Sequence, residues 1–205
     1  MSIAVNTRFI ALTIALAVTA CGDESGQGSE TNVPDSTTTT TTSPTSSSSD
    51  TDDSSGTGEP ACVEDDLMAS VFAGPGYDPE NGGLQEPLQD EYVASTTLLA
   101  LRPETAQAFV ETVTAMIPVL TANPGLVGFS TAQSAKCGTA RTLTVWRDEM
   151  AMMSFVTSDE HVAGMTRASE FSTTGTVTSW KVTRAEVPIA WEVAMARAAD
   201  TTPSY

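Results

Sequence analysis

The fold is decided by the stretch Leu143-Thr-Val-Trp-Arg-Asp-Glu-Met-Ala-Met-Met-Ser-Phe-Val-Thr-Ser-Asp-Glu-His161. Its beginning belongs to a strand expected over 139–147, in which Leu and Val point to one side while two Thr and Trp146 point to the other. Asp148 can then cap a helix, and Ser158 can cap a second helical segment. The stretch therefore predicts a strand followed by two helical segments.

The residues on either side of this stretch complete a domain. Further strands are expected over 92–101, 126–131 and 176–184, with one helix from Pro103 to the Asn123-Pro124-Gly125 stop and another from Pro188. The order is strand, helix, strand, strand, helix, strand, helix. This order predicts an α+β fold of the ferredoxin-like, split βαβ type, with an antiparallel sheet, helices on one face and an extra C-terminal helix.

A sheet covered on one face leaves its other face to be buried by something else. We expect this second face to carry Trp146 and, with it, Trp180. The face then lines a pocket, packs against a second copy of the chain, or does both.

The first residues are typical of a targeting segment. Arg8 precedes the apolar run 9–20, which is too short to span a bilayer and suits the core of a signal peptide over residues 1–20. The run ends in Val18-Thr19-Ala20-Cys21-Gly22, which resembles the lipobox of bacterial lipoproteins. That resemblance implies acylation of Cys21, with a thioether-linked diacylglyceryl group and a further acyl chain such as palmitate, and stable anchoring by these chains. The alternative is an ordinary secretory signal that contains a cysteine.

Residues 21–60 have a different composition from the rest. From residue 22 on, the stretch holds eight acidic residues, no Lys or Arg and runs of Thr and Ser. Such a segment buries too little apolar surface to offset the entropy of ordering, so we expect a disordered tether. We place the protein outside the cytoplasm, lipid-anchored in the bacterial cell envelope.

Residues 61–205 are long enough for one domain with its own core. They hold 18 acidic and 8 basic residues. An acidic surface without a basic cluster argues against nucleic acid and against docking on anionic lipids. We expect an irregular segment over 61–91 packed on a domain over 92–205.

Two cysteines remain besides Cys21. Cys62 and Cys137 form an even pair, and in an oxidising compartment they favour a disulfide. A metal site is the alternative, but neither has a His or another Cys at ligand spacing. We expect no metal.

The quoted stretch resembles the strand–helix core of antibiotic biosynthesis monooxygenase-like (ABM) domains, over about 92–184. In those domains a strand ends in an aromatic residue, Asp-Glu opens the helix and a His follows a break; Pro124-Gly-Leu-Val-Gly128 also matches. The resemblance implies a dimeric α/β barrel, in which the open sheet faces of two subunits enclose a cavity. It also implies chemistry that ranges from cofactor-free oxygenation of polycyclic phenols to haem degradation, along with members of no known activity.

Carried over by position, His161 matches the family's histidine and Trp146 the aromatic residue that ends the strand. These two are the candidate catalytic residues. The chain departs from the pattern at Phe155, where many members have a second His, and in lacking an Asn on the first strand.

Each candidate also has a structural interpretation. His161 is the only histidine, so any imidazole base must be this residue, but it can equally be a half-buried residue at a helix start. Trp146 can fill a core, and Trp180 and Trp191 are expected in cores. Other side chains fit packing, capping or surface pairing better than ligand binding; they are Met150, Met152, Met153, Met165, Asp148, Glu149, Arg141 and Arg147.

Two functions follow from these residues. One is a cofactor-independent monooxygenase acting on a small aromatic or quinone-like substrate, with no cofactor and with Trp146 and His161 facing a cavity. The other is a non-catalytic envelope lipoprotein that uses the barrel for ligand binding or for dimerisation. Whether the protein is an enzyme stays open at this point.

Overall fold

The computed structural model describes residues 62–81 and 83–205. The predicted signal peptide, the predicted lipidation site Cys21 and the predicted tether lie outside these residues. Within them, no helix is long and apolar enough to cross a membrane.

The core of the structure is an antiparallel sheet of five strands in the order β1-β5-β6-β4-β7. The four long strands have the neighbours expected of a ferredoxin-like fold, since β4 lies between β6 and β7. The strands are β1 (Met68–Ala69), β4 (Glu91–Leu101), β5 (Leu126–Ser134), β6 (Thr139–Trp146) and β7 (Ser172–Thr183), and β2 (Tyr77–Asp78) pairs separately with β3 (Gly83–Leu84). The predicted α+β, split βαβ fold is confirmed.

Helices α2 and α3 begin where the capping signals predict, whereas the C-terminal helix predicted from Pro188 begins at Trp191. The Asp148 carboxylate accepts a hydrogen bond from the Ala151 backbone N–H at the start of α2 (Glu149–Val156), and the Ser158 hydroxyl accepts one from the His161 N–H at the start of α3 (Asp159–Thr166). The remaining helical elements are η1 (Pro103–Thr105), α1 (Ala106–Ala122), α4 (Ala168–Phe171), η2 (Arg184–Glu186) and α5 (Trp191–Ala199). Short α4 was not predicted, and β7 begins four residues earlier than expected.

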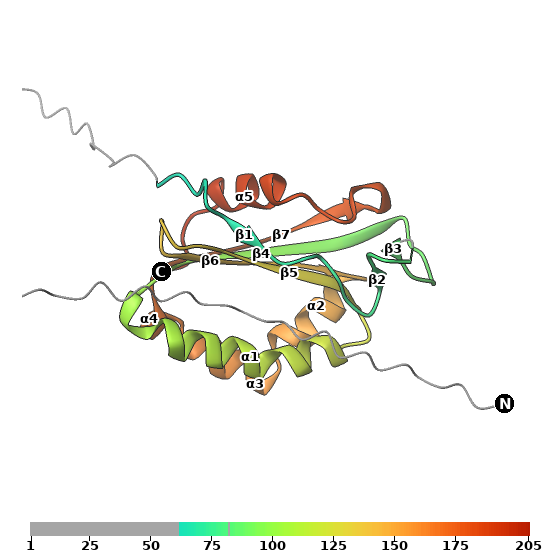
Figure 1. The fold of residues 1–205 in the computed structure, drawn as a ribbon. Helices are drawn as coiled ribbons and strands as arrows, with labels where there is room; N and C mark the ends of the chain where they lie inside the picture. Colours follow the sequence, from blue (N-terminus) through green and yellow to red (C-terminus); the bar gives the residue numbers. More distant parts are fainter. Residues whose placement is uncertain (1–61, 82) are drawn as a thin grey trace, which may run out of the picture. The chain divides into compact units, whose positions relative to one another are not determined.

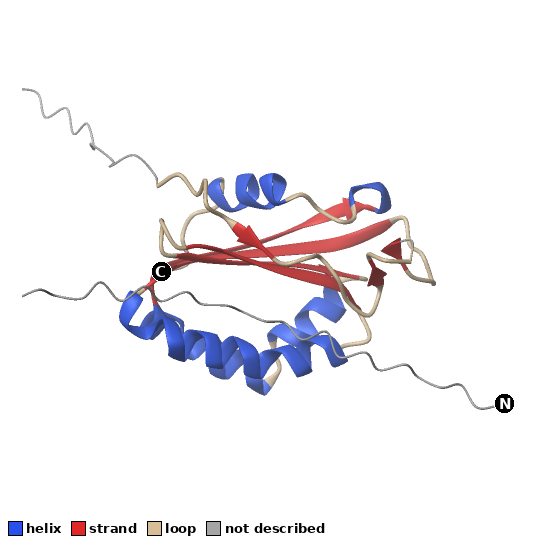
Figure 2. Cartoon of the chain, viewed as in Figure 1, coloured by secondary structure: helices blue, strands red, loops and turns tan. Residues whose placement is uncertain are grey.

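Both faces of the sheet are covered within one chain. Helices α1 to α4 lie on one face, and α5 lies on the other together with the segment that carries β1 (Figure 1). Figure 2 shows the sheet between these two layers. On the α5 side, Phe72 of that segment and Ala194 of α5 belong to one buried cluster with Leu143 and Val145 of β6.

The prediction of a sheet covered on one face is therefore wrong. The open face expected for a second copy is filled by α5 and residues 62–84, so two copies cannot pack sheet to sheet as expected. Trp146 also lies on the other face from the one predicted, because its even-numbered side of β6 is the side that α1 to α4 cover. A homodimer stays a prediction that requires another surface.

Residues 62–66 are fastened to the β5–β6 hairpin. The Cys62–Cys137 disulfide is present, with the two Cα atoms 5.7 Å apart. Beside it the Arg141 Nε atom pairs with the Glu64 Oε2 atom at 2.7 Å, and both side chains are at least nine-tenths buried. Asp66 accepts hydrogen bonds from the Ser134 hydroxyl and the Lys136 backbone N–H. The segment is a fixed part of the domain.

Replacing Ala194 by Arg tests whether α5 is an integral cover. Ala194 is fully buried against the sheet, so we expect the charged side chain to lower the free energy of unfolding by at least about 3 kcal/mol. Val193→Arg is the control, because Val193 on the same helix is 45% exposed and should change stability little. Urea denaturation at two protein concentrations measures both. An Ala194→Arg midpoint as high as that of Val193→Arg at both concentrations would show that α5 is not an integral cover.

Candidate functional site

An apolar cavity of about 270 Å³ lies between the sheet and helices α1 to α4. Its floor is the face of the sheet opposite α5, and its roof comes from α1, α2, α3 and the short α4. The floor residues are Thr97, Leu99, Phe129, Thr131, Ala140, Thr142, Thr144, Gly175 and Val177. The roof includes Phe109, Thr112, Val113, Met116, Ile117, Leu120, Phe155, His161, Gly164, Met165, Ala168 and Phe171. His161 and Tyr205 are the only ionisable side chains among the lining residues.

Threonine hydroxyls form a band across the cavity floor. Thr131 of β5 lies opposite Thr142 of β6, which in turn lies opposite Thr97 of β4. One step along β6, the Thr144 hydroxyl accepts a hydrogen bond from the Trp146 Nε1 atom at 2.9 Å. Strand alternation places these side chains on one face, so the floor offers a few polar contacts in a hydrophobic site, as ligand pockets commonly do.

His161 lines the cavity from the first turn of α3. Its Nδ1 atom lies 3.0 Å from the Val156 carbonyl oxygen, which can only accept, so Nδ1 carries the proton of the neutral ring. Its Nε2 atom makes no hydrogen bond among residues 62–81 and 83–205 and keeps its lone pair. Burial lowers the pKa of His161 below 6.5, and the hydrogen bond to Val156 opposes this more weakly. The imidazole is therefore neutral at pH 7, with Nε2 able to accept a proton.

Trp146 does not line the cavity but supports the wall that does. Its side chain is buried and stacks on Phe155, with ring centroids 5.5 Å apart. Phe155 in turn meets the His161 ring edge to face, at 4.8 Å. A direct role for Trp146 at the cavity is not supported, because Phe155 stands between it and His161. We interpret Trp146 as a positioning residue for the Phe155–His161 pair.

Sequence reasoning missed Tyr205, which lines the cavity together with Ser204. The segment after α5 has no periodic pattern, so its sequence gave no signal of a structural role. It also missed the contribution of α1, because no residue of this helix was predicted to belong to the site.

Of the remaining side chains named from the sequence, Met165 lines the cavity and the others lie outside it. Arg141 pairs with Glu64, as the interpretation of a partner for carboxylates predicts, although the pair is buried and not exposed. Met152 of α2 is buried in a cluster with Leu126 and Trp146, while Met150 and Met153 are exposed. Trp180 and Trp191 pack against the core cluster on the α5 side. In the described part of the chain, no group of three or more His, Cys, Asp or Glu side chains could hold a metal ion.

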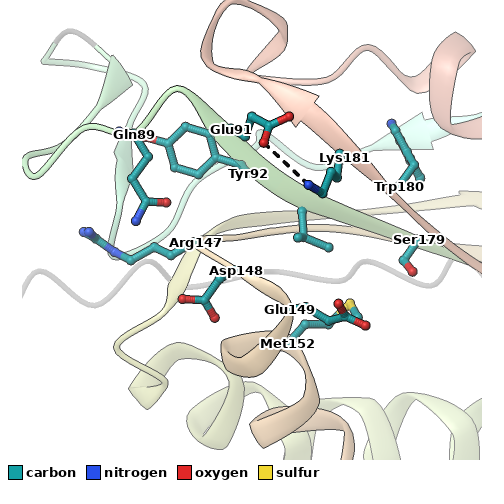
Figure 3. A pocket seen from close by; sticks show the side chains of 11 residues that line it. Gln89, Glu91, Tyr92, Arg147, Asp148, Glu149, Met152, Ser179, Trp180 and Lys181 are labelled. Atoms are coloured by element: carbon teal, nitrogen blue, oxygen red, sulfur yellow. Dashed lines mark hydrogen bonds and ion pairs between the residues drawn. The ribbon is translucent and has the colours of Figure 1, made fainter.

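A second hollow of about 470 Å³ lies where β4 begins and β7 ends (Figure 3). It is larger than the cavity but open, and charged side chains from both strands and from α2 surround it. Lys181 pairs with Glu91 across it at 3.6 Å, with both side chains mostly exposed. Arg147 donates to the Pro87 carbonyl oxygen. Because this hollow is open and the ion pair across it lies in solvent, it is a weaker candidate than the apolar cavity at His161.

Comparison with protein families identifies the domain. Residues 93–167 match the family model of antibiotic biosynthesis monooxygenase. The chain carries an ABM-like domain. The matched residues run from β4 through α3 and include Trp146, Phe155 and His161.

Solved structures with a similar fold have low sequence identity. Rv0793 from Mycobacterium tuberculosis is 22% identical with a TM-score of 0.41, and the match covers 43% of this chain and 92% of that one. A putative antibiotic biosynthesis monooxygenase from Nitrosomonas europaea is 10% identical with a TM-score of 0.42, over 50% of this chain and 98% of that one. No curated protein matches the sequence.

Proposed function

We propose that the ABM-like domain binds a small, flat, largely apolar molecule and oxidises it with O2 without a cofactor, with His161 as the base. The observation that carries the proposal is the neutral imidazole in a mostly buried apolar cavity, with Nδ1 held by Val156 and Nε2 without a hydrogen bond among the described residues. A general base must be oriented and unprotonated at the working pH, and His161 meets both conditions.

The proposed reaction converts an acidic CH2 group of the substrate into a carbonyl group. The Nε2 atom of His161 takes one proton, and the resulting carbanion transfers one electron to O2. The carbon radical and superoxide then combine to form the C–O bond. The peroxide takes back the proton from His161, and loss of water breaks the O–O bond and leaves C=O. One CH2 group and one O2 thus give one C=O and one H2O. The apolar walls keep bulk water from the carbanion.

The alternative is a domain that binds the same ligand without converting it. Phe155 favours this candidate, because it occupies the place where many ABM domains have a second imidazole. His161 is then a hydrogen-bond acceptor for a ligand hydroxyl or amide. The two candidates share the binding site and differ only in whether O2 is consumed.

An oxygen electrode distinguishes the two candidates, with anthrone as the probe and with no flavin, haem or metal added. The proposal expects one O2 taken up for each anthraquinone formed, unaffected by a chelator. Thr142→Phe, which fills the cavity from its floor, should abolish uptake, whereas Met150→Ala on the exposed side of α2 should not. Binding without uptake would support the alternative. Absence of binding by anthrone and by related phenols and quinones would overturn both.

We also propose that the domain works in the bacterial cell envelope, attached through acylated Cys21. The lipobox-like sequence and the apolar run before it support this proposal, and the Cys62–Cys137 disulfide suits an oxidising compartment. Cells given radioactive palmitate should label the full chain, and Cys21→Ser should remove the label. An equally labelled Cys21→Ser chain would contradict the anchor.

A further inference from the structure

The segment after α5 crosses from one face of the sheet to the other. Helix α5 lies opposite the cavity, yet Tyr205 lines it, so residues 200–205 pass the outer edge of β7 (Figure 1). The Ser204 N–H donates to the Gly175 carbonyl oxygen at 2.6 Å, and the Thr174 hydroxyl donates to the Tyr205 carbonyl oxygen at 3.0 Å. These two hydrogen bonds hold the end of the segment beside the first residues of β7.

The Tyr205 ring occupies a space left by the missing side chain of Gly175, which we call its seat. A Cβ atom added to Gly175 would lie 2.6 Å from the Tyr205 hydroxyl oxygen and 2.8 Å from its Cζ atom, so only glycine leaves room for the ring. The hydroxyl lies 2.7 Å from the hydroxyl of buried Ser172. Ser172 already donates to the Ala168 carbonyl oxygen, so Tyr205 is the donor in this pair.

Tyr205 stands where the cavity opens. Most of the lining residues are buried or half-buried, and the exposed ones lie together on the β7 side. They are Met165 at the end of α3, Val177 on the edge of β7, Ser204 and Tyr205. The exposed fractions of Met165, Val177 and Tyr205 are 45%, 42% and 44%. The mouth therefore lies between α3 and the edge of β7, and the Tyr205 ring covers part of it.

We propose that Tyr205 is the movable outer wall of the cavity and determines which ligands enter. Its segment is held mainly by three hydrogen bonds at a sheet edge, so it can open locally while the sheet stays folded. Along β6 the floor extends from Ala140 to Thr144, or roughly 13 Å at about 3.3 Å per residue. His161 stands near the Thr144 end and Tyr205 near the Ala140 end, beside Gly175. The wall thus limits the length of a ligand that reaches the imidazole; this last step rests on the proposed function.

Access to the cavity is tested without any ligand. In the full chain carrying Cys21→Ser, Thr142→Cys places a thiol on the floor, and its rate of reaction with a disulfide reagent reports opening. Adding Gly175→Ala, which removes the seat without altering Tyr205, should raise this rate at least tenfold. Tyr205→Phe, which loses only the hydrogen bond to Ser172, should raise it by a smaller factor. Val193→Ala, at an exposed position of α5, is the control and should leave the thiol reaction rate unchanged.

Thermal denaturation of each variant confirms that the sheet is folded. An equal thiol reaction rate in the Gly175→Ala chain and its parent would overturn the proposal, whether both rates are fast or slow.

A second readout compares binding of 2-naphthol, with two rings, and 1-aminopyrene, with four. Gly175→Ala should favour the larger probe at least tenfold relative to the parent. Failure of both probes to bind either chain would count against the proposed function, while the thiol rates would still decide the role of Tyr205.

Discussion

Replacing His161 by Ala is expected to lower the turnover of the ABM-like domain by roughly 10²- to 10⁴-fold, the usual contribution of a general base. No other lining residue can replace it, because Tyr205 is the only other ionisable group and its hydroxyl proton is already donated to Ser172. His161→Gln is the sharper variant, since its amide can still reach a neighbouring carbonyl but cannot take a proton at neutral pH. Initial rates of O2 uptake measure the loss.

Measuring probe affinity beside turnover shows whether His161 acts in catalysis or only supports the shape of the cavity. If His161 is the base, His161→Gln should keep the affinity for the probe within a few-fold while turnover falls. Phe155→Leu is the matched control, because it alters the packing beside the imidazole and leaves the base present. Equal turnover in the His161→Gln chain and the wild type would exclude the proposed chemistry.

The pH dependence follows from the lowered pKa of His161. Burial places this pKa below 6.5, so the activity should rise with pH through the folded-state value and be constant above 6.5. Between the folded and unfolded pKa values the unfolded chain binds more protons, so the free energy of unfolding also rises with pH there. On acidification this stability is lost from 6.5 downward. The loss should be absent in His161→Gln, as urea denaturation at several pH values would show.

The sequence predicts local features of this fold well, because they depend on neighbouring residues. Asp148 and Ser158 cap helices because their side chains reach backbone N–H groups three residues away. The alternation along β6 sorts its side chains correctly into two sets. Neither the capping residues nor the alternation, however, indicates which helix or segment covers each face of the sheet.

The cover on the α5 side could not be predicted for a physical reason. The buried residues of helix α5 are the small Ala194 and Ala198, and an apolar stripe on a helix does not say which face of the sheet the helix covers. The segment over 62–84 contributes single side chains such as Phe72 through very short strands. Their positions are fixed by contacts with β5 and β6 that are distant in sequence, which no local pattern encodes.

The candidate site likewise contains one residue that the sequence could predict and features that it could not. His161 could be predicted, since it is the only imidazole and follows a helix break. Its orientation could not, because it depends on the carbonyl oxygen of Val156, a group that every residue type supplies. Tyr205 could not be predicted either, because its seat depends on a glycine thirty residues earlier in the chain.

Removing the disulfide with Cys62→Ser and Cys137→Ser is expected to lower the free energy of unfolding by about 4 kcal/mol. The cross-link spans 75 residues, and the chain-entropy model gives this magnitude for a loop of that length. Urea denaturation of the double variant and of the oxidised wild type measures the difference. The reduced wild type is the control and should match the variant. A loss below about 1 kcal/mol would show that other contacts already hold the segment in the unfolded state or that strain offsets the gain.

The same variant should show that the two faces of the sheet can be perturbed separately. When residues 62–66 detach, Glu64 leaves Arg141 buried without its charge partner, and an unpaired buried charge is costly. This cost opposes detachment but no longer acts together with a covalent link. Wherever the segment does detach, the apolar surface around Phe72 becomes accessible to an apolar dye. The cavity at His161 lies on the opposite face and shares no side chain with this cluster. Below its unfolding midpoint the double variant should therefore bind the dye on the α5 side while keeping probe affinity at the cavity, and loss of both together would mean that the sheet unfolds as one unit with its cover.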